Sequence, residues 1–336
     1  MSARTLGLLA LLAPLAWGAP NGMGGMPGMP GKPSSRPTTP QHTRPAPVLR
    51  LLKVSPEMVL SGDLEGRLAR WSFAGGKLGA PIPAGQLDGA VLDLVLVGEH
   101  VLAVDDGGAL YRLGKPDPVR LATHPGGAVA LAARVDGELL ATAGGDGTIR
   151  LWGLDGAERG VLQGHEGQVA QVVFDPNTPT RLWSVGHDGS LRSWKLRGGK
   201  GDKPYKGKSK VEHSLQRERT DLVATPDGAH LLSCNYTGAV TLWDVEKRKL
   251  KATPLPTRSN AEQARQIAVS PEGKRAVVAL SGESALWVIE LEHPKAPRRL
   301  DRGQDAPASV TFVDETTLAV GSFGGKVERV ALGGGK

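Results

Sequence analysis

From residue 48 onward, apolar residues occur in short runs that end at glycine-containing turns. The runs at 59–61, 101–104, 139–142 and 231–233 are strand-like in length and composition. This part of the chain has no segment with a convincing helical period. The pattern predicts an all-β protein built from many short strands.

The same pattern repeats at a nearly constant interval. A glycine followed five residues later by a large apolar residue occurs seven times, and successive end positions are separated by 42, 39, 42, 49, 44 and 43 residues. That interval is typical of four-stranded propeller blades, and five of the six tryptophans outside the first 18 residues lie at this register. We therefore predict a seven-bladed β-propeller of four-stranded antiparallel blades over residues 48–336. The seven pairs are Gly66/Trp71, Gly108/Leu113, Gly147/Trp152, Gly189/Trp194, Gly238/Trp243, Gly282/Trp287 and Gly325/Val330.

Two stretches identify the kind of propeller. Residues 141–152 read ATAGGDGTIRLW, residues 184–194 read SVGHDGSLRSW, and Trp243-Asp244 is a literal Trp-Asp pair. With these motifs the chain resembles the WD-repeat (WD40) β-propeller family, in an exported bacterial form. The resemblance implies an Asp-Gly turn between the second and third strands of a blade, and four side chains hydrogen-bonded together. In this sequence they are His124, Thr142, Asp146 and Trp152 in repeat three, and His165, Ser184, Asp188 and Trp194 in repeat four.

The chemistry of these side chains explains the combination. A buried indole N–H needs an acceptor, a hydroxyl can accept from it and donate onward, and an imidazole links the hydroxyl to a carboxylate. The set contains Ser, His and Asp, but no nucleophile elbow or strand-to-helix turn surrounds the serine. We expect a structural network and not a catalytic triad.

The remaining repeats depart from this set, and we expect them to lack the network while apolar packing keeps their blades intact. Repeat one keeps Ser61 and Trp71 with Glu65 at the Asp position, and repeat five keeps Ser233 and Trp243 with Thr237 there. Repeats two, six and seven have Ala103, Val277 and Val320 at the hydroxyl position.

The way in which the ring closes is a separate question, because the chain ends six residues after Val330. That is too short for a further outer strand. Residues 38–46 are expected to supply it, although Pro40 and Pro45 there and Pro47 beside them are poor ladder donors. We predict either a short closing strand or a three-stranded last blade.

The N-terminal residues have a different composition. Residues 1–18 read as a secretory signal peptide, with Arg4, an apolar stretch from Leu6 to Ala16, and small residues suited to cleavage after Gly18. Residues 19–47 are rich in Gly, Pro and Met and are expected to be a disordered spacer. The localisation expected is periplasmic or secreted, and the composition favours a bacterial source. Within the spacer, Met23, Met26 and Met29 are soft thioether ligands of the kind that suits Cu(I), so copper handling is an alternative function.

The resemblance also indicates a binding face, where the turns before the third strands gather. The residues that precede the turn Asp positions are Leu64, Asp106, Gly145, His187, Tyr236, Leu280 and Phe323. Three of them, His187, Tyr236 and Phe323, are large enough to anchor a protein partner. The alternative is that they only cover the mouth of the channel.

A second candidate surface is the insertion that lengthens the fourth interval, residues 197–210. Its lysines, with Tyr205 among them, could bind an acidic polymer or lipid phosphates, and the alternative is a solvated, mobile loop at or beside the outer strand of blade four. The binding residues proposed there are Lys203, Tyr205, Lys206 and Lys208.

Charge and motifs narrow the function further. The net charge of +7 permits anionic partners without specifying nucleic acid, and the single Cys234 excludes an intramolecular disulfide. No Cys-x-x-Cys-His or other propeller-enzyme motif is found, so no cofactor is expected and an enzyme is disfavoured. The expected function is a monomeric, non-catalytic protein-interaction scaffold without a transmembrane segment.

Overall fold

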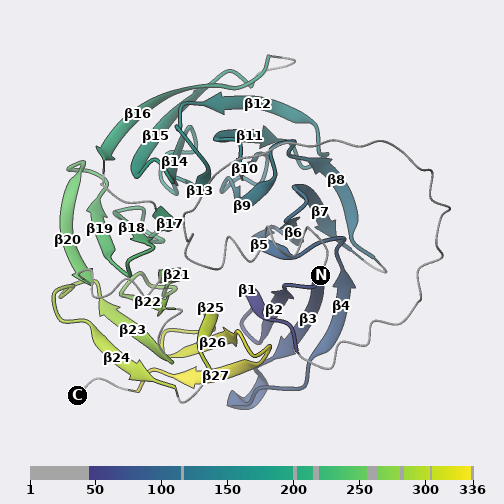
Figure 1. Cartoon of the computed structure of the whole chain (residues 1–336), viewed down its shortest axis with the longest axis vertical. Helices are drawn as coiled ribbons and strands as arrows, with labels where there is room; N and C mark the ends of the chain where they lie inside the picture. The colour runs from purple at the N-terminus through teal and green to yellow at the C-terminus, as the bar shows by residue number, and fades with distance from the viewer. Residues whose placement is uncertain are drawn as a thin grey trace, which may run out of the picture. The chain divides into compact units, whose positions relative to one another are not determined.

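The computed structural model describes residues 45–114, 117–199, 203–214, 219–255, 264–280, 284–302 and 305–333. These residues form 27 strands and one 3-10 turn, η1 (Ala74–Gly76). The strands make seven antiparallel sheets arranged around a centre (Figure 1). The predicted seven-bladed, all-β propeller is confirmed.

Each blade is a meander in which consecutive strands pair, from the innermost strand outward. Blades 1 and 2 comprise β1 (Val48–Ser55), β2 (Met58–Asp63), β3 (Arg67–Ser72), β4 (Ile82–Gln86), β5 (Val91–Val97), β6 (His100–Asp105), β7 (Ala109–Leu113) and β8 (Val119–Thr123). Blades 3 and 4 comprise β9 (Ala128–Ala133), β10 (Leu140–Gly144), β11 (Thr148–Trp152), β12 (Glu158–Gln163), β13 (Val169–Phe174), β14 (Arg181–Gly186), β15 (Ser190–Arg197) and β16 (Lys206–Ser214). Blades 5 to 7 comprise β17 (Arg219–Ala224), β18 (His230–Asn235), β19 (Val240–Asp244), β20 (Lys249–Leu255), β21 (Ala264–Val269), β22 (Arg275–Leu280), β23 (Ala285–Glu290), β24 (Arg298–Asp301), β25 (Pro307–Phe312), β26 (Thr317–Ser322) and β27 (Val327–Ala331).

The innermost strands hold the ring together. Each contacts the innermost strand of the next blade, and β25 of blade 7 contacts β1 of blade 1. The core lies between the blades because each sheet buries apolar side chains against its neighbour. Between blades 3 and 4 this layer includes Ile149, Phe174 and Trp194, and between blades 4 and 5 it includes Trp183 and Trp243.

Blade 7 contains three strands in the described part of the chain. Residues 45–47 lie next to it without strand geometry, and residues 38–44 are outside the described residues. The three-stranded alternative therefore matches what the structure describes. The seam is closed instead at the inner strands, where the Ser309 hydroxyl donates to the Val48 carbonyl at 2.8 Å. Gly321 allows this approach, because a Cβ there would lie 2.6 Å from Val48 Cγ1.

The predicted glycine-to-tryptophan register is wrong in blade 6. At the other six positions the large apolar residue pairs with the residue 12 positions before it, as Trp152 does with Leu140. Trp287 instead pairs with Val278, and Ile289 lies opposite Ala276. An extra residue in this hairpin shifts the pairing, so Trp287 lies nearer to the turn than its counterparts.

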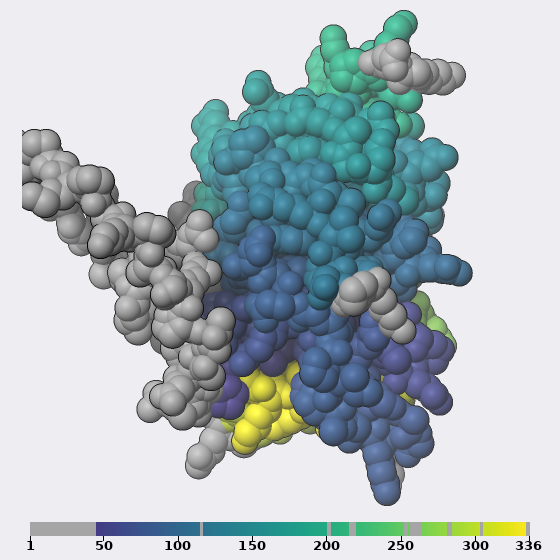
Figure 2. Space-filling model, turned by 90° about the vertical axis from the view of Figure 1, so that its right-hand side faces the viewer, coloured from purple at the N-terminus to yellow at the C-terminus, as the bar shows by residue number. Residues whose placement is uncertain are grey.

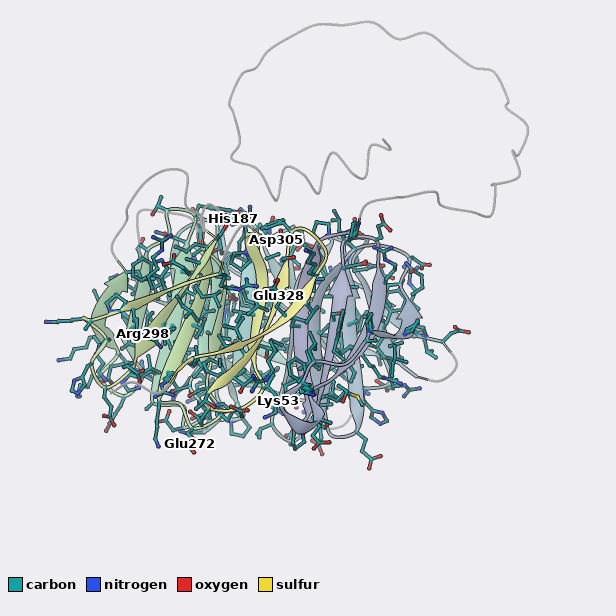
Figure 3. All side chains as sticks on the ribbon, turned by 90° about the horizontal axis from the view of Figure 1, so that it is seen from below. Lys53, His187, Glu272, Arg298, Asp305 and Glu328 are labelled. Carbon is teal, nitrogen blue, oxygen red and sulfur yellow. The ribbon has the colours of Figure 1, made fainter. Side chains whose placement is uncertain are left out.

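The two faces of the ring are distinct. The face that carries the turns between the second and third strands, His187 among their residues, is called the upper face. The opposite face is called the lower face. Figure 3 shows His187 and Asp305 on the upper face, and Lys53 and Glu272 on the lower face.

Candidate protein-binding surface

The structure brings together all four side chains of the network expected in blade 3. The Thr142 hydroxyl lies 2.7 Å from His124 Nδ1 and accepts from the Trp152 indole at 2.9 Å. The other imidazole nitrogen lies 3.3 Å from an oxygen of Asp146. Burial lowers the pKa of His124, although the nearby Asp146 opposes this shift. The ring is therefore held neutral and links the hydroxyl to the carboxylate.

Blade 4 has the same arrangement, more deeply enclosed. Ser184 Oγ lies 2.7 Å from His165 Nε2 and accepts from the Trp194 indole at 2.8 Å, while His165 Nδ1 lies 3.0 Å from Asp188. Burial opposes ionisation of Asp188, but the Ser190 backbone N–H and the charge of His165 lower its pKa to about 2. Every polar group is used within the blade, so the geometry leaves the Ser184 hydroxyl no role as a nucleophile.

A glycine makes room for each imidazole. A Cβ on Gly144 would lie 2.3 Å from His124 Nε2, and a Cβ on Gly186 would lie 2.7 Å from His165 Nδ1. Real Cβ atoms do not approach other atoms so closely. The network therefore requires glycine two residues before the turn Asp.

In blades 1, 2, 5 and 7 the equivalent position carries a polar side chain that closes the turn differently. Its oxygen accepts from the backbone N–H four residues later, at 2.9 Å for Asp63 and Arg67, 2.8 Å for Asp105 and Ala109, 3.0 Å for Asn235 and Ala239, and 3.1 Å for Ser322 and Lys326. We call these four residues, Asp63, Asp105, Asn235 and Ser322, the upstream caps. The family motif places its acid two residues later, so it does not identify these caps; the signal in the sequence is an Asp or Asn three residues before the turn glycine in blades 1, 2 and 5.

The Trp–hydroxyl pair has different outcomes in the two repeats that keep only part of the network. In blade 1, the Trp71 indole donates to the Ser61 hydroxyl at 2.8 Å. In blade 5, the Trp243 indole nitrogen is buried and has no acceptor in the described part of the chain. Its ring instead lies against His213, with centroids 5.3 Å apart.

The three residues predicted as anchors for a protein partner all lie on the upper face. His187, Tyr236 and Phe323 belong to the β14–β15, β18–β19 and β26–β27 turns of blades 4, 5 and 7, and each is partly buried. His187 and Tyr236 meet edge to face with centroids 5.7 Å apart, and the tyrosine oxygen lies 3.4 Å from His187 Nε2.

Arg265, at the start of β21 in blade 6, completes this group. Its guanidinium lies 5.8 Å from the centre of the Phe323 ring. Burial lowers the pKa of Arg265, and the neighbouring Tyr236 partly offsets the shift. The four side chains thus form one row across four consecutive blades, which we call the upper-face patch: His187, Tyr236, Arg265 and Phe323. Arg265 could not be found from the sequence, because its neighbours in the patch come from other repeats.

Part of the insertion at 197–210 is strand: residues 206–210 belong to the outer strand of blade 4, whereas residues 198–199 and 203–205 have no strand geometry. Residues 206–214 form β16, the outer strand of blade 4, and Lys206 and Lys208 are exposed on it. The mobile-loop alternative is wrong for these residues, because β16 pairs with β15 along its whole length. Figure 2 shows this end of blade 4, in teal to green, standing out from the rest of the molecule.

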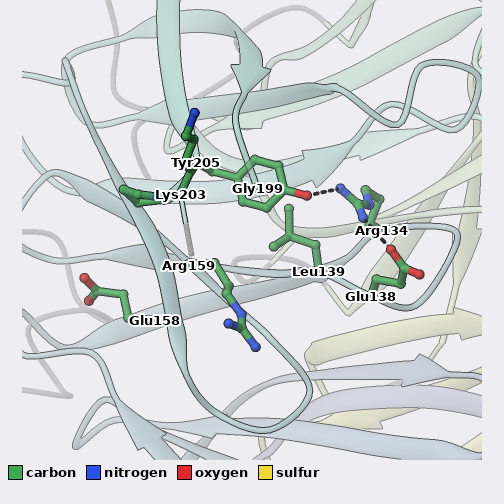
Figure 4. Close-up of a pocket in the computed structure, with 9 residues that line it drawn as sticks. Arg134, Glu138, Leu139, Glu158, Arg159, Gly199, Lys203 and Tyr205 are labelled. Atoms are coloured by element: carbon green, nitrogen blue, oxygen red, sulfur yellow. Dashed lines mark hydrogen bonds and ion pairs between the residues drawn. The ribbon is translucent and has the colours of Figure 1, made fainter. Parts of the chain in front are cut away.

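Tyr205 and Lys203 lie apart from those strand lysines, in a pocket of about 310 Å³ between blades 3 and 4 (Figure 4). The Tyr205 hydroxyl accepts from Arg134 at 3.2 Å, and its backbone N–H donates to the Arg159 carbonyl at 2.6 Å. Arg134 is in turn paired with Asp136 and Glu138. Tyr205 therefore fastens the hairpin to blade 3, and the expected ligand-binding role for it has no support in these contacts.

Sequence reasoning also missed a ring of polar residues that lines the centre. Each innermost strand has a bulge near its start. The residue that directly follows the bulge is polar in six of the seven blades. In order of blade, these positions are Arg50, Asp93, Ala130, Gln171, Asp221, Gln266 and Ser309.

The side chains of this ring tie blades to their neighbours at every junction except the one between blades 3 and 4. Asp93 accepts from the Leu131 N–H at 2.9 Å, Asp221 from the Ile267 N–H at 2.7 Å, and Gln266 from the Val310 N–H at 3.0 Å. Burial raises the pKa of both Asp93 and Asp221, and the Arg50 charge opposes the rise. These buried carboxylates are engaged with backbone donors, which is a structural role.

The described residues contain no group of three or more His, Cys, Asp or Glu side chains placed to hold a metal ion. They also include no helix that is long and apolar enough to cross a membrane. Met23, Met26 and Met29 lie outside the described residues.

Comparison with known proteins agrees with this architecture. The family model described as WD domain, G-beta repeat, matches residues 118–153 and 156–195, the strands β8 to β15. The chain is 36% identical over 94 residues to the small ribosomal subunit protein RACK1 of Candida albicans, covering 26% of this chain and 27% of that protein. It is 25% identical over 251 residues to mouse Striatin-4, covering 66% of this chain and 33% of that protein. The chain thus matches only a quarter to a third of the length of these relatives.

Among solved structures, the WD40 β-propeller domain of Doa1 superposes with a TM-score of 0.70 at 17% sequence identity, covering 86% of this chain and 93% of that domain. This likeness concerns the fold alone. The matched repeats are the two blades whose His, hydroxyl, Asp and Trp side chains form the complete network. The chain is therefore a seven-bladed β-propeller, and two of its blades match the WD40 repeat.

Proposed function

We propose that this protein is a non-catalytic interaction scaffold that binds a protein partner through the upper-face patch. The observation that carries the proposal is the row of His187, Tyr236, Arg265 and Phe323, drawn from four consecutive blades. Aromatic and arginine side chains dominate the energetics of protein interfaces. The names of the relatives, a ribosomal subunit protein among them, are consistent with a role in assemblies.

The rigidity of the platform supports the same function. Each turn below the patch is closed by its own hydrogen bonds, from Asp188 in blade 4, Asn235 in blade 5 and Ser322 in blade 7. A partner that docks on preorganised side chains loses less conformational entropy on binding. The anchors therefore need no rearrangement to receive it.

The test is partner capture with the triple variant His187→Ala, Tyr236→Ala and Phe323→Ala. Truncation of one interface hot spot costs about 2 kcal/mol or more, so the triple variant should bind its partner at least about 30-fold more weakly. Glu272→Ala with Lys274→Ala is the matched control, since these lower-face side chains pair with each other at 2.5 Å. Equal capture by the patch variant and the control, with both variants folded, would show that the patch is not the binding site.

We also propose that the protein is exported to the cell envelope or medium. The support is the basic start, apolar stretch and small residues of the first 18 positions. N-terminal sequencing of the protein from its native source should begin at Ala19. Replacing Ala16 by Glu should block cleavage and leave the longer chain, whereas cytoplasmic protein that starts at Met1 would contradict export.

The Met-rich spacer stays a hypothesis of Cu(I) binding, supported by ligand type and spacing alone. A competition titration of the whole protein with a Cu(I) chelator tests it, against a variant with Met23, Met26 and Met29 replaced by Leu. Equal Cu(I) affinity in the two proteins would dismiss this role.

A further inference from the structure

The outer strand of blade 4 has features that the upper-face function leaves unexplained. β16 has nine residues and is the longest strand of the described chain. In the described residues it pairs with β15 alone, so its outer edge carries no strand. A long uncovered edge is a template for further strand pairing, which proteins normally suppress.

The charges on β16 are arranged along one face. Lys206, Lys208 and Lys210 are exposed and occupy alternate positions, with Gly207 and Ser209 between them. Alternate residues of a strand point to the same side and are about 6.7 Å apart. The strand therefore presents three evenly spaced lysines on one face, beside its uncovered edge, and of these Lys210 is paired with Glu212.

The neighbouring strand adds to this charge and does not neutralise it. Arg197 lies directly opposite Lys206, and Lys195 lies directly opposite Lys208. Like charges in directly opposite positions destabilise a sheet. The acid that follows on the same strand, Glu212, is already paired with Lys210 at 2.8 Å and with Arg248 at 3.5 Å.

The residue that precedes β16 is held against blade 3 by two hydrogen bonds. The Tyr205 backbone and hydroxyl are bound to Arg159 and Arg134 of blade 3. Farther along the strand, Val211 is 46% exposed and offers an apolar contact on the face opposite the lysines. The edge is thus preorganised, cationic on one side and partly apolar on the other.

We propose that β16 is a docking edge for an acidic polypeptide segment in extended conformation, which adds to blade 4 as a fifth strand. Acidic residues at alternate positions would lie beside Lys206, Lys208 and Lys210, at the same spacing as the lysines. Backbone hydrogen bonds would supply affinity and the lysine row would supply selectivity. The same lysines repel a second copy of this edge. The lysine row therefore prevents self-association and also selects an acidic strand.

The experiment uses the full chain and a ten-residue peptide of alternating Glu and Thr. Fluorescence anisotropy measures its affinity at physiological salt, and hydrogen exchange follows the β16 amides. Three further probes separate the explanations: a peptide of the same composition with its Glu residues in one block, the alternating peptide N-methylated at every second residue, and inorganic polyphosphate.

The alternating peptide should bind best and should slow exchange of the β16 amides. Reversing two exposed charges removes two attractions and adds two repulsions, so Lys206→Glu with Lys208→Glu should weaken binding by about tenfold or more. The control Lys77→Glu with Lys295→Glu makes the same charge change at exposed positions outside β16 and should leave the affinity unchanged. The upper-face triple variant should also bind the peptide normally, which keeps this result separate from the proposed scaffold function.

The proposal is overturned if the block peptide, the N-methylated peptide or polyphosphate binds as tightly as the alternating peptide, because charge alone would then suffice. It is also overturned if no peptide binds, because the lysines would then serve only to keep the edge soluble.

Discussion

Blades 3 and 4 close the turn between their second and third strands with a histidine from the preceding loop, whereas blades 1, 2, 5 and 7 close it with an upstream cap. In the first group, His124 and His165 reach over Gly144 and Gly186 to the turn Asp. In the second group a side chain at the glycine position itself binds the backbone of the turn. The two solutions exclude each other, because one atom beyond Cα at that position occupies the place of the imidazole. Blades 1, 2, 5 and 7, which lack the complete network, therefore close the same turn with different chemistry.

The strongest test of this exclusion is to place an upstream cap in a blade that has the histidine. Gly144→Asp should destabilise the protein by about 3 kcal/mol, because its Cβ would overlap the His124 ring. Adding His124→Ala removes the imidazole and leaves only Asp146 Oδ1 close to the new Cβ, at 2.5 Å, so the double variant should recover more than about 1 kcal/mol relative to additivity. Urea unfolding measures both effects, and Asn235→Asp, which keeps an acceptor at an existing cap, is the control. Strict additivity would show that the two turn closures do not compete.

The next test separates the upstream cap from the residue that takes the family Asp position in blade 1. Asp63 accepts from the Glu65 and Arg67 backbone N–H groups at 2.9 Å, and it pairs with the Arg67 guanidinium. Asp63→Ala should lower the free energy of unfolding by about 2 kcal/mol, since donors are left unsatisfied. Glu65→Ala, at the family position, should change it by less than about 0.5 kcal/mol. The reverse order in denaturant unfolding would mean that Glu65 closes the turn.

A third comparison asks what the indole hydrogen bond contributes. Trp194→Phe and Trp243→Phe remove the same atoms from two buried sites, but only the Trp194 indole donates to a hydroxyl. The Trp194 substitution should therefore cost about 1 kcal/mol more than the Trp243 substitution. Equal losses in thermal or urea unfolding would assign both costs to packing alone.

The smallest expected effect is the pH dependence of the network. Burial lowers the pKa of His165 in the folded state. At a pH between this lowered pKa and the ordinary histidine pKa, the ring therefore takes up a proton when the protein unfolds. The resulting stability is present above that ordinary pKa and is lost as pH falls through the folded-state value. His165→Asn should flatten the fall in unfolding free energy between about pH 7 and pH 5. A fall of unchanged steepness in this variant would place the titration elsewhere, with His124 and His230 the other histidines whose pKa is lowered.

The interface between blades 3 and 4 shows the limit of what local sequence reveals. At the polar ring each of the other six blades contributes a polar or charged side chain, but blade 3 contributes Ala130. Here the Arg134–Tyr205 contact and a large apolar layer join the blades instead. The sequence showed an alanine and an unusual insertion, without any sign that the two features belong to one interface.

The repeat period, the number of blades, the all-β class and the two complete WD40 repeats could all be derived from the sequence, because they depend on patterns within about 45 residues of chain. The same holds for His187, Tyr236 and Phe323, whose turn positions follow from the register. Only the tertiary structure showed the shift in blade 6, the upstream caps, Arg265 in the patch, the polar ring and the place of the β16 lysines beside an uncovered strand edge. Each of these features depends on the hydrogen-bond register or on contacts with a different strand or blade. Arg265 of blade 6, for example, contacts Phe323 of blade 7. Short-range patterns specify how a blade forms, whereas the packing of blades against one another decides which side chains meet.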